Sequence, residues 1–335
     1  MPSSSKLVNT SDAFEIRLVH YLGNHDATSP FVLECESYIS EGDASSLLRK
    51  IFDHSPALDV LFNCLSSQRL FVNAASGSED GVHAFSLLSA LLDGIEDGKE
   101  VEEVMNVIVD AVEKYQPGEE TDDEKKQAIV EKKMKMLCAL YNLRHDGKEK
   151  CWILGRILHT CAFGGVDECV LSLLPGRDST FGTLLEKNNL GSLLAGLEKE
   201  GSQILSSTDK RSLFAIASAV TAKVEEVCKE KGMEKEASTA YGSKQRFLLK
   251  MLSSYSTIND VDEEAIAAAT KAAVGAISDP ISLFHEQRCI MSLPPVMALA
   301  NDKGESTSTF LSLSQNLCFV PKLLVKGEFY HSKLT

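Results

Sequence analysis

The sequence predicts an all-α protein whose successive helices stack on one another as a helical-repeat solenoid. Three observations lead to this fold class. Apolar residues recur at the three-to-four-residue spacing of an amphipathic helix, no convincing alternating strand pattern occurs before residue 300, and short turns join the helical stretches. Amphipathic helices joined by short loops pack antiparallel to their neighbours. No fixed period in residue identity is present, so the predicted repeat is structural.

Residues 1–125 are predicted to form an N-terminal helical region. Residues 1–10 are Ser-rich and are expected to fray. Two helices follow later in this region, with a turn at Asp97-Gly98 between them. Their apolar positions are Phe85, Leu88, Leu91 and Leu92 in the first, and Val101, Val104, Ile108 and Val112 in the second. Residues 117–126 are rich in acidic side chains and predict a polar connection, because they lack the alternating oxygen ligands and central Gly of a calcium loop.

Residues 126–300 are predicted to form the main helical repeats. The first helix is expected to bury Met134, Leu137, Cys138 and Tyr141. Asp146 should cap the next helix. That helix is expected to bury Ile153, Ile157 and Cys161 and to stop at Gly164-Gly165. A short helix over residues 166–174 and helical structure over 181–200 should follow.

Three longer helices complete this region. The first has a predicted inner face of Leu213, Ala217, Val220, Val224 and Val227. The second is predicted over residues 235–255. The third is rich in alanine, begins at a cap supplied by Asp260, and ends before Pro280, since the residue before a proline is disfavoured in the α region. Ile266, Ala273 and Ile277 are expected to share its buried stripe, which would let a neighbouring helix approach closely.

The charge and cysteine content restrict the function classes. The net charge of −14 disfavours nucleic-acid binding by the body of the chain, because an acidic surface repels phosphate groups. Nine cysteines without C-x-x-C pairs, and no recognisable signal peptide, indicate a reducing compartment. No apolar run reaches the roughly 18 residues of a membrane span. We therefore expect a cytoplasmic protein that does not insert in a membrane.

No motif in the sequence predicts a catalytic, cofactor-binding or metal-binding residue. Phosphate-binding glycine loops and nucleophile elbows are missing. His285, Glu286 and Cys289 resemble the start of a zinc-protease helix but lack a third ligand nearby, so a structural role is favoured. Cys161 and Cys169 fall on apolar faces, and His159 points elsewhere. A helical hydrolase that uses Cys161 or the His285 region is kept as a remote alternative.

Several stretches of residues 131–300 resemble PCI-domain proteins, and in particular the PCI-domain subunits of eukaryotic translation initiation factor three. Residues 133–143 look like the family's opening helix, and residues 210–214 like the start of a later one. The leucine-rich residues 247–255 end in Ser-Tyr as the family's do. The Ala-rich stretch 272–280 and Leu293-Pro294-Pro295-Val296 follow in the family's order.

The resemblance implies a right-handed solenoid of the PCI type and a non-catalytic scaffold subunit without cofactors. Its partners would be other subunits of initiation factor three and, through the complex, the small ribosomal subunit. Such complexes support recruitment of mRNA and initiator tRNA, while direct RNA contact by the acidic body is not expected. A PCI-type subunit of the signalosome or the proteasome lid is the alternative. Residues 301–335 are too few for the family's winged-helix module, so we expect an atypical tail from a truncated or mis-joined gene product or an alternative ending.

Overall fold

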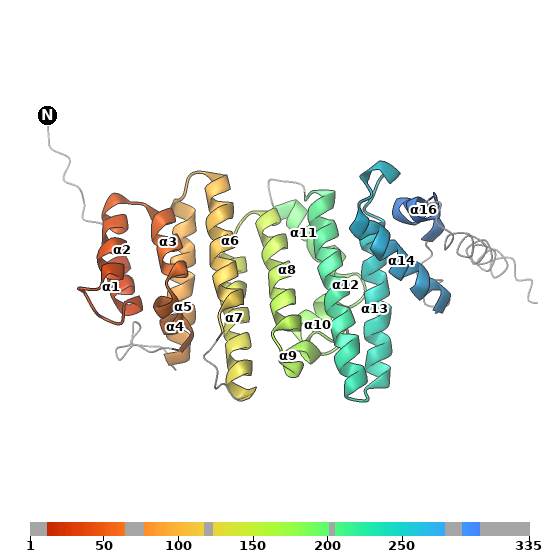
Figure 1. The fold of residues 1–335 in the computed structure, drawn as a ribbon, viewed down its shortest axis with the longest axis horizontal. Helices are drawn as coiled ribbons and strands as arrows, with labels where there is room; N and C mark the ends of the chain where they lie inside the picture. The colour runs from red at the N-terminus through yellow and green to blue at the C-terminus, as the bar shows by residue number, and fades with distance from the viewer. Residues whose placement is uncertain (1–11, 64–76, 117–122, 201–204, 279–289, 302–335) are drawn as a thin grey trace, which may run out of the picture. The chain divides into compact units, whose positions relative to one another are not determined.

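The fold was examined in a computed structural model, which describes residues 12–63, 77–116, 123–200, 205–278 and 290–301. Within these ranges every regular element is a helix and none is a strand (Figure 1). The all-α prediction is therefore confirmed. The predicted tail at 301–335 and the His285 region lie outside the described residues, apart from Asn301.

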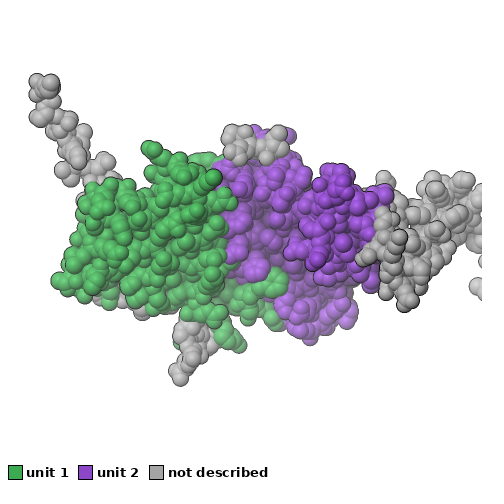
Figure 2. All heavy atoms as spheres, turned by 45° about the horizontal axis from the view of Figure 1, so that its top comes forward, with its two compact units in different colours: residues 1–145, 163–169 green, residues 146–162, 170–335 purple. Residues whose placement is uncertain are grey.

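The chain forms two compact units, coloured separately in Figure 2. Unit 1 contains residues 1–145 and 163–169, and unit 2 contains residues 146–162 and 170–335. The chain therefore passes from unit 1 to unit 2, returns for seven residues, and then stays in unit 2. These units do not divide the chain at residue 125, where the sequence predicts a boundary between helical regions.

Unit 1 is built from α1 (Asp12–Leu22), α2 (Pro30–Glu41), α3 (Ala44–Asp53), α4 (Ser55–Asn63), α5 (Gly77–Ala90), the 3-10 turn η1 (Leu91–Gly94), α6 (Gly98–Lys114) and α7 (Asp123–Leu143). The predicted apolar faces of α5 and α6 are buried, except that Leu91 belongs to η1 and is only half-buried. Asp97 caps α6 by accepting a hydrogen bond from the Lys99 amide at 2.9 Å.

The buried face of α7 differs from the predicted one. Met136, Leu137 and Leu140 are fully buried, while Met134, Cys138 and Tyr141 are only half-buried. The helix also buries Lys132 and Lys133, at 8% and 9% exposure. The predicted stripe was built from apolar residues alone and therefore did not include these two lysines.

Unit 2 begins with α8 (Gly147–Phe163, of which residues 147–162 belong to the unit) and shares the short α9 (Asp167–Ser172) with unit 1. Its other elements are α10 (Thr180–Leu184), α11 (Asn189–Glu200), α12 (Ser207–Glu230), α13 (Glu234–Leu252), η2 (Ile258–Asp260), α14 (Glu263–Ser278), η3 (Ile290–Ser292) and α16 (Pro294–Asn301). Helices α12 and α13 run side by side as a hairpin (Figure 1), and Gly232 in the turn between them has a φ of +70°.

The predicted elements of unit 2 are mostly present. Asp146 accepts hydrogen bonds from the amides of Lys148 and Glu149, as a cap for α8 requires. The five residues on the predicted inner face of α12 are all buried. The segment 181–200 is broken into two helices, α10 and α11, and Lys187 in the break has a φ of +45°.

Two predictions around α13 and α14 were wrong. Helix α13 ends at Leu252 instead of residue 255, which leaves Tyr255 outside the helix. Helix α14 is capped by Asp262, which accepts from the Ala265 amide at 2.7 Å. The carboxylate of Asp260 instead accepts from the hydroxyl of Thr257. Both aspartates satisfy the capping preference, and only the path of the chain through η2 selects between them.

Candidate functional site

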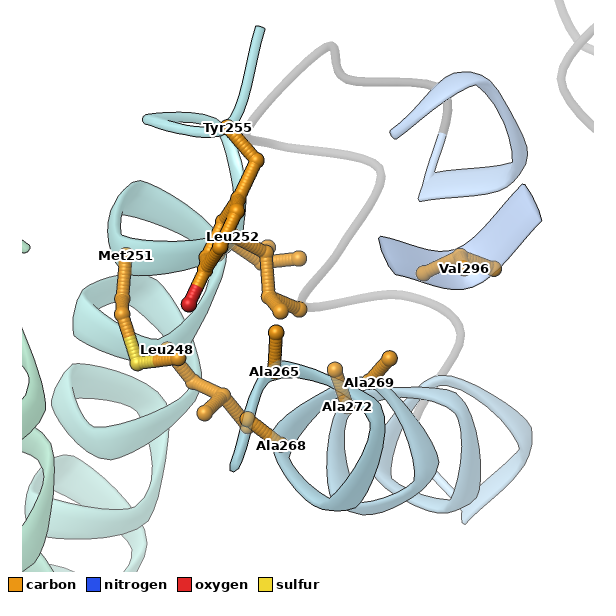
Figure 3. Packing of buried hydrophobic residues seen from close by; sticks show 10 residues of the cluster. Leu248, Met251, Leu252, Tyr255, Ala265, Ala268, Ala269, Ala272 and Val296 are labelled. Atoms are coloured by element: carbon orange, nitrogen blue, oxygen red, sulfur yellow. The ribbon is translucent and has the colours of Figure 1, made fainter. Parts of the chain in front are cut away.

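The four helices at the C-terminal end of the described chain share one hydrophobic cluster. In Figure 3, α13 faces α14, and Val296 of α16 lies across from the alanines of α14. The partly buried Phe214 and Ala215 of α12 pack against the same cluster. Its buried members are Leu248, Leu249, Met251, Leu252, Tyr255, Ala265, Ala268, Ala269, Ala272 and Val296.

Alanine determines how closely α14 approaches α13. The predicted stripe was correct at Ala273, which is buried, but Ile266 is only half-buried and Ile277 is not described at the side-chain level. The buried stripe is instead made of alanines with a glycine, Gly275, at its end. A Cβ on Gly275 would lie 2.5 Å from the side-chain amide nitrogen of Gln245, so a larger residue would force α14 away from α13 or displace that side chain.

Polar contacts join the start of α12 to the turn after α13. The guanidinium of Arg211 lies 3.5 Å from the ring centroid of Tyr255, and its Nε donates to the Ser254 hydroxyl at 3.1 Å. The Tyr255 hydroxyl donates to the carboxylate of Asp262 at 3.3 Å. Burial raises the pKa of Tyr255 and Asp262 raises it further, while Arg211 opposes the rise. The phenol therefore remains a neutral hydrogen-bond donor at neutral pH.

A buried carboxylate fixes α12 against α13. Glu225 forms ion pairs with Lys229 on its own helix at 2.6 Å and with Lys244 of α13 at 2.5 Å. Burial opposes ionisation of Glu225, but hydrogen bonds from the two lysines outweigh it and lower the pKa. The spacing of Glu225 and Lys229 was a readable signal in the sequence. The contact with Lys244, nineteen residues away, was not.

The surfaces of the two units differ in charge. Unit 1 contains 27 acidic and 13 basic residues, a net charge of −14, and unit 2 contains 21 of each. From the sequence, one net charge was assigned to the body of the chain, without a division between regions. The division into units instead assigns the whole imbalance to unit 1.

Cys161, His159 and Cys169, the residues considered for catalysis that the structure describes, are not arranged as an active site. Cys161 is fully buried, with its Sγ 3.7 Å from the Ser172 hydroxyl, whereas His159 is exposed. Cys169 is buried as predicted, and burial raises its pKa, with Glu131 and Glu168 adding to the rise. Burial also raises the pKa of Cys35 and Cys151 to about 12. These thiols remain protonated, which opposes nucleophilic chemistry.

The described ranges also bear on metal binding and on membrane spans. No group of three or more His, Cys, Asp or Glu residues in the described ranges could hold a metal ion. Among the described helices, none combines the length and apolar character needed to cross a membrane. His285, Glu286 and Cys289 lie outside the described residues, so the structural role predicted for them stays a prediction.

Comparison with known proteins gave no relative. No protein family, no curated protein and no solved structure matches the chain.

Proposed function

We propose that this protein is a non-catalytic scaffold subunit of the translation initiation factor three complex, built as a PCI-type solenoid. Within that factor, the resemblance of its sequence is to subunit M. In this role it would bind other subunits of the complex and, through them, the small ribosomal subunit. It would act in the cytoplasm and support recruitment of mRNA and initiator tRNA to the small ribosomal subunit.

One observation carries the proposal. Three of the stretches on which the resemblance depends, residues 247–255, 272–280 and 293–296, contribute to the single cluster of Figure 3. A fourth, residues 210–214, supplies Phe214 to this cluster and Arg211 to the contact with Tyr255. Weak similarities that are scattered along a chain gain weight when their residues pack together, because one packing arrangement can then account for all of them.

The surface of the described residues suits protein partners. Of the large apolar side chains that are exposed there, Ile258, Val274 and Met297 belong to η2, α14 and α16, the last elements of unit 2. Unit 1, at −14, would attract basic protein surfaces and repel nucleic acid. Binding to other proteins, rather than to RNA directly, is consistent with both features.

The test is purification of the tagged full-length chain from its own cells, followed by mass spectrometry. Initiation factor subunits together with small-subunit ribosomal proteins are the expected partners. Recovery of ubiquitin-pathway components would favour the signalosome or proteasome lid instead. Recovery of neither set, from a chain expressed at normal level, would contradict a scaffold role in all three complexes.

A surface variant makes the test specific. Val274→Glu places a charge on a side chain that is 58% exposed, and Thr270→Glu makes the same change one helical turn earlier at another exposed position of α14. If α14 contributes to a partner interface through its apolar residue, Val274→Glu should reduce recovery of the partners several-fold more than Thr270→Glu. Equal recovery would assign the interface to another part of the chain.

A catalytic role for Cys161 has a direct test as well. Cys161→Ala removes the thiol from a fully buried position, so a modest loss of stability is expected. Partner recovery and biological activity should be retained. Loss of activity in a variant that is folded and still bound to its partners would support the hydrolase alternative.

A further inference from the structure

Two adjacent lysines of α7 bind the ends of two different helices in unit 1. The ammonium group of Lys132 donates to the carbonyl oxygen of Phe62 at 2.5 Å, and that of Lys133 donates to the carbonyl oxygen of Glu113 at 2.7 Å. Phe62 is the penultimate residue of α4, and Glu113 is the penultimate residue of α6. Neighbouring positions on a helix point about 100° apart, which allows one helix to reach two neighbours.

The same two helix ends also contact each other. The rings of Phe62 and Tyr115 are stacked, with centroids 4.0 Å apart and planes 7° apart. The Tyr115 hydroxyl donates to the carboxylate of Asp59 at 3.0 Å, one turn before the end of α4. The C-terminal ends of α4 and α6 therefore lie against each other, next to α7.

This arrangement gathers negative charge. The last four carbonyl groups of a helix have no partner within the helix, and together they carry about half a negative charge. Two such ends meet here, with Asp59 and Glu113 nearby, in a unit whose net charge is already −14. Without a cation the two ends would repel each other, and the carbonyl oxygens of Phe62 and Glu113 would lose the donors that the lysines supply.

Burying the lysines has its own cost. Burial lowers the pKa of Lys133, although Glu113 opposes the change, so the environment disfavours the charged form overall. Lys135, two residues further along α7, is exposed. A buried ammonium group persists only where it replaces lost hydration with good acceptors, and carbonyl groups at a helix C-terminus are such acceptors.

We propose that Lys132 and Lys133 form a double clasp, in which each ammonium group caps one helix and the pair holds the C-terminal ends of α4 and α6 together. The clasp is a conformational device of unit 1 and does not depend on the proposed function. It assigns one helix end to each lysine: Lys132 controls the end of α4, and Lys133 controls the end of α6.

Hydrogen–deuterium exchange of the full-length chain tests this assignment. Lys132→Met keeps an unbranched side chain and removes the charge, and amide exchange at residues 58–63 should rise roughly 10- to 100-fold, the range for loss of a hydrogen bond to a charged donor. Lys133→Met should produce the same rise at residues 110–115. Lys135→Met is the matched control and should leave both segments unchanged, and the amides of α12 and α13 should be unaffected in all three variants.

Three results would overturn the clasp. Exchange at both helix ends within twofold of the Lys135→Met control would show that neither lysine caps a helix. An equal rise at both ends in each single variant would remove the one-to-one assignment. A uniform rise over α1–α7 would show that the lysines support the unit as a whole. If the Met variants fail to fold, Lys132→Arg and Lys133→Arg can be used instead, because they retain the charge. Both helix ends should then stay protected from exchange. Fast exchange at the ends in these Arg variants would also contradict the proposal.

Discussion

Units 1 and 2 contain buried lysine or glutamate side chains for opposite reasons. In unit 1, Lys132 and Lys133 are buried on backbone carbonyl groups, where they offset the partial negative charge of two helix ends. In unit 2, the buried charge is Glu225, and Lys229 and Lys244 surround it. The acidic unit thus buries two cations on backbone carbonyl groups, whereas the neutral unit buries one carboxylate between two lysine side chains. Lysine therefore stabilises helix ends in the acidic unit and a buried carboxylate in the neutral unit.

The largest expected difference between the units is in the stability lost when a closely packed helix glycine is replaced by alanine. A Cβ on Gly81 of α5 would lie 1.9 Å from the carbonyl oxygen of Leu61, which belongs to the backbone of α4, whereas the atoms nearest a Cβ on Gly275 belong to the Gln245 side chain. We expect Gly81→Ala to destabilise the protein by about 3 kcal/mol and Gly275→Ala by about 1 kcal/mol, because a side chain moves more easily than a backbone.

Chemical denaturation of both variants measures this difference. Gly196→Ala in α11 is the control, since nothing lies within 4 Å of its added Cβ, and it should stabilise the protein by about 0.5–1 kcal/mol. Equal losses for Gly81→Ala and Gly275→Ala would show that α5 can shift relative to α4 as readily as Gln245 can move.

The buried ion pairs of unit 2 should make its stability depend on pH. The folded-state pKa of Glu225 is lowered, so its contribution is fully present above the unfolded value of 4.5 and is lost as pH falls through the folded pKa. Glu225→Gln should cost about 2 kcal/mol at pH 7, since it leaves Lys244 without its carboxylate partner.

Denaturation curves at pH 7 and at acidic pH separate this contribution from others. The difference between wild type and Glu225→Gln should shrink as the pH falls below 4.5. A difference that stays constant down to pH 2 would mean that the carboxylate gains no stability from the two lysines.

Helix caps should contribute similarly in both units, whatever the surrounding charge. Asp43 caps α3 by accepting from the Ser46 amide at 2.9 Å, and Ser206 forms a capping box with Asp209 at the start of α12. Asp43→Ala and Ser206→Ala should each lower the free energy of unfolding by about 1 kcal/mol. Asp43→Asn keeps the acceptor and serves as the control. If Asp43→Asn were as destabilising as Asp43→Ala, the charge of the cap rather than its hydrogen bond would be responsible.

Salt concentration should have the smallest effect on stability, and the effect should differ between the negatively charged unit 1 and the neutral unit 2. Self-repulsion in unit 1 is screened as ionic strength rises, so amide protection in α1–α6 should increase slightly between low and physiological salt. Unit 2 has no net charge, and the protection of α12 and α13 should change less. A larger gain in unit 2 would indicate that local ion pairs, not net charge, dominate the response.

Much of the fold could be read from the sequence, and the failures have specific causes. The inner face of α12 was predicted in full because five apolar residues recur at helical spacing on a long helix. The face of α7 was misplaced because the prediction used apolar residues alone, whereas Lys132 and Lys133 are part of the buried face. Asp260 was chosen over Asp262 as the cap of α14, although local preference does not distinguish them.

At the candidate site too, some features could be predicted from the sequence and others could not. The alanine-rich character of α14 and its close packing could be anticipated from composition, while Ile266 was taken as a marker of a buried stripe in which it is only half-buried and to which alanines and Gly275 contribute. The contacts of Arg211 with Tyr255 and of Glu225 with Lys244 join residues 44 and 19 positions apart. No periodic pattern connects such pairs.

The sequence by itself determined that the described part of the chain is helical, where most of its helices lie, and that Cys161 and Cys169 are buried, because these properties follow from the spacing of apolar residues along the chain. Only the tertiary structure decided that the acidic charge belongs to unit 1, that two lysines of α7 cap two other helices, and that residues of α12, α13, α14 and α16 share one hydrophobic cluster. The physical reason is the distance along the chain between the residues that interact. Helical periodicity acts between residues three and four apart, whereas charge balance and the capping of distant helix ends depend on which helices become neighbours.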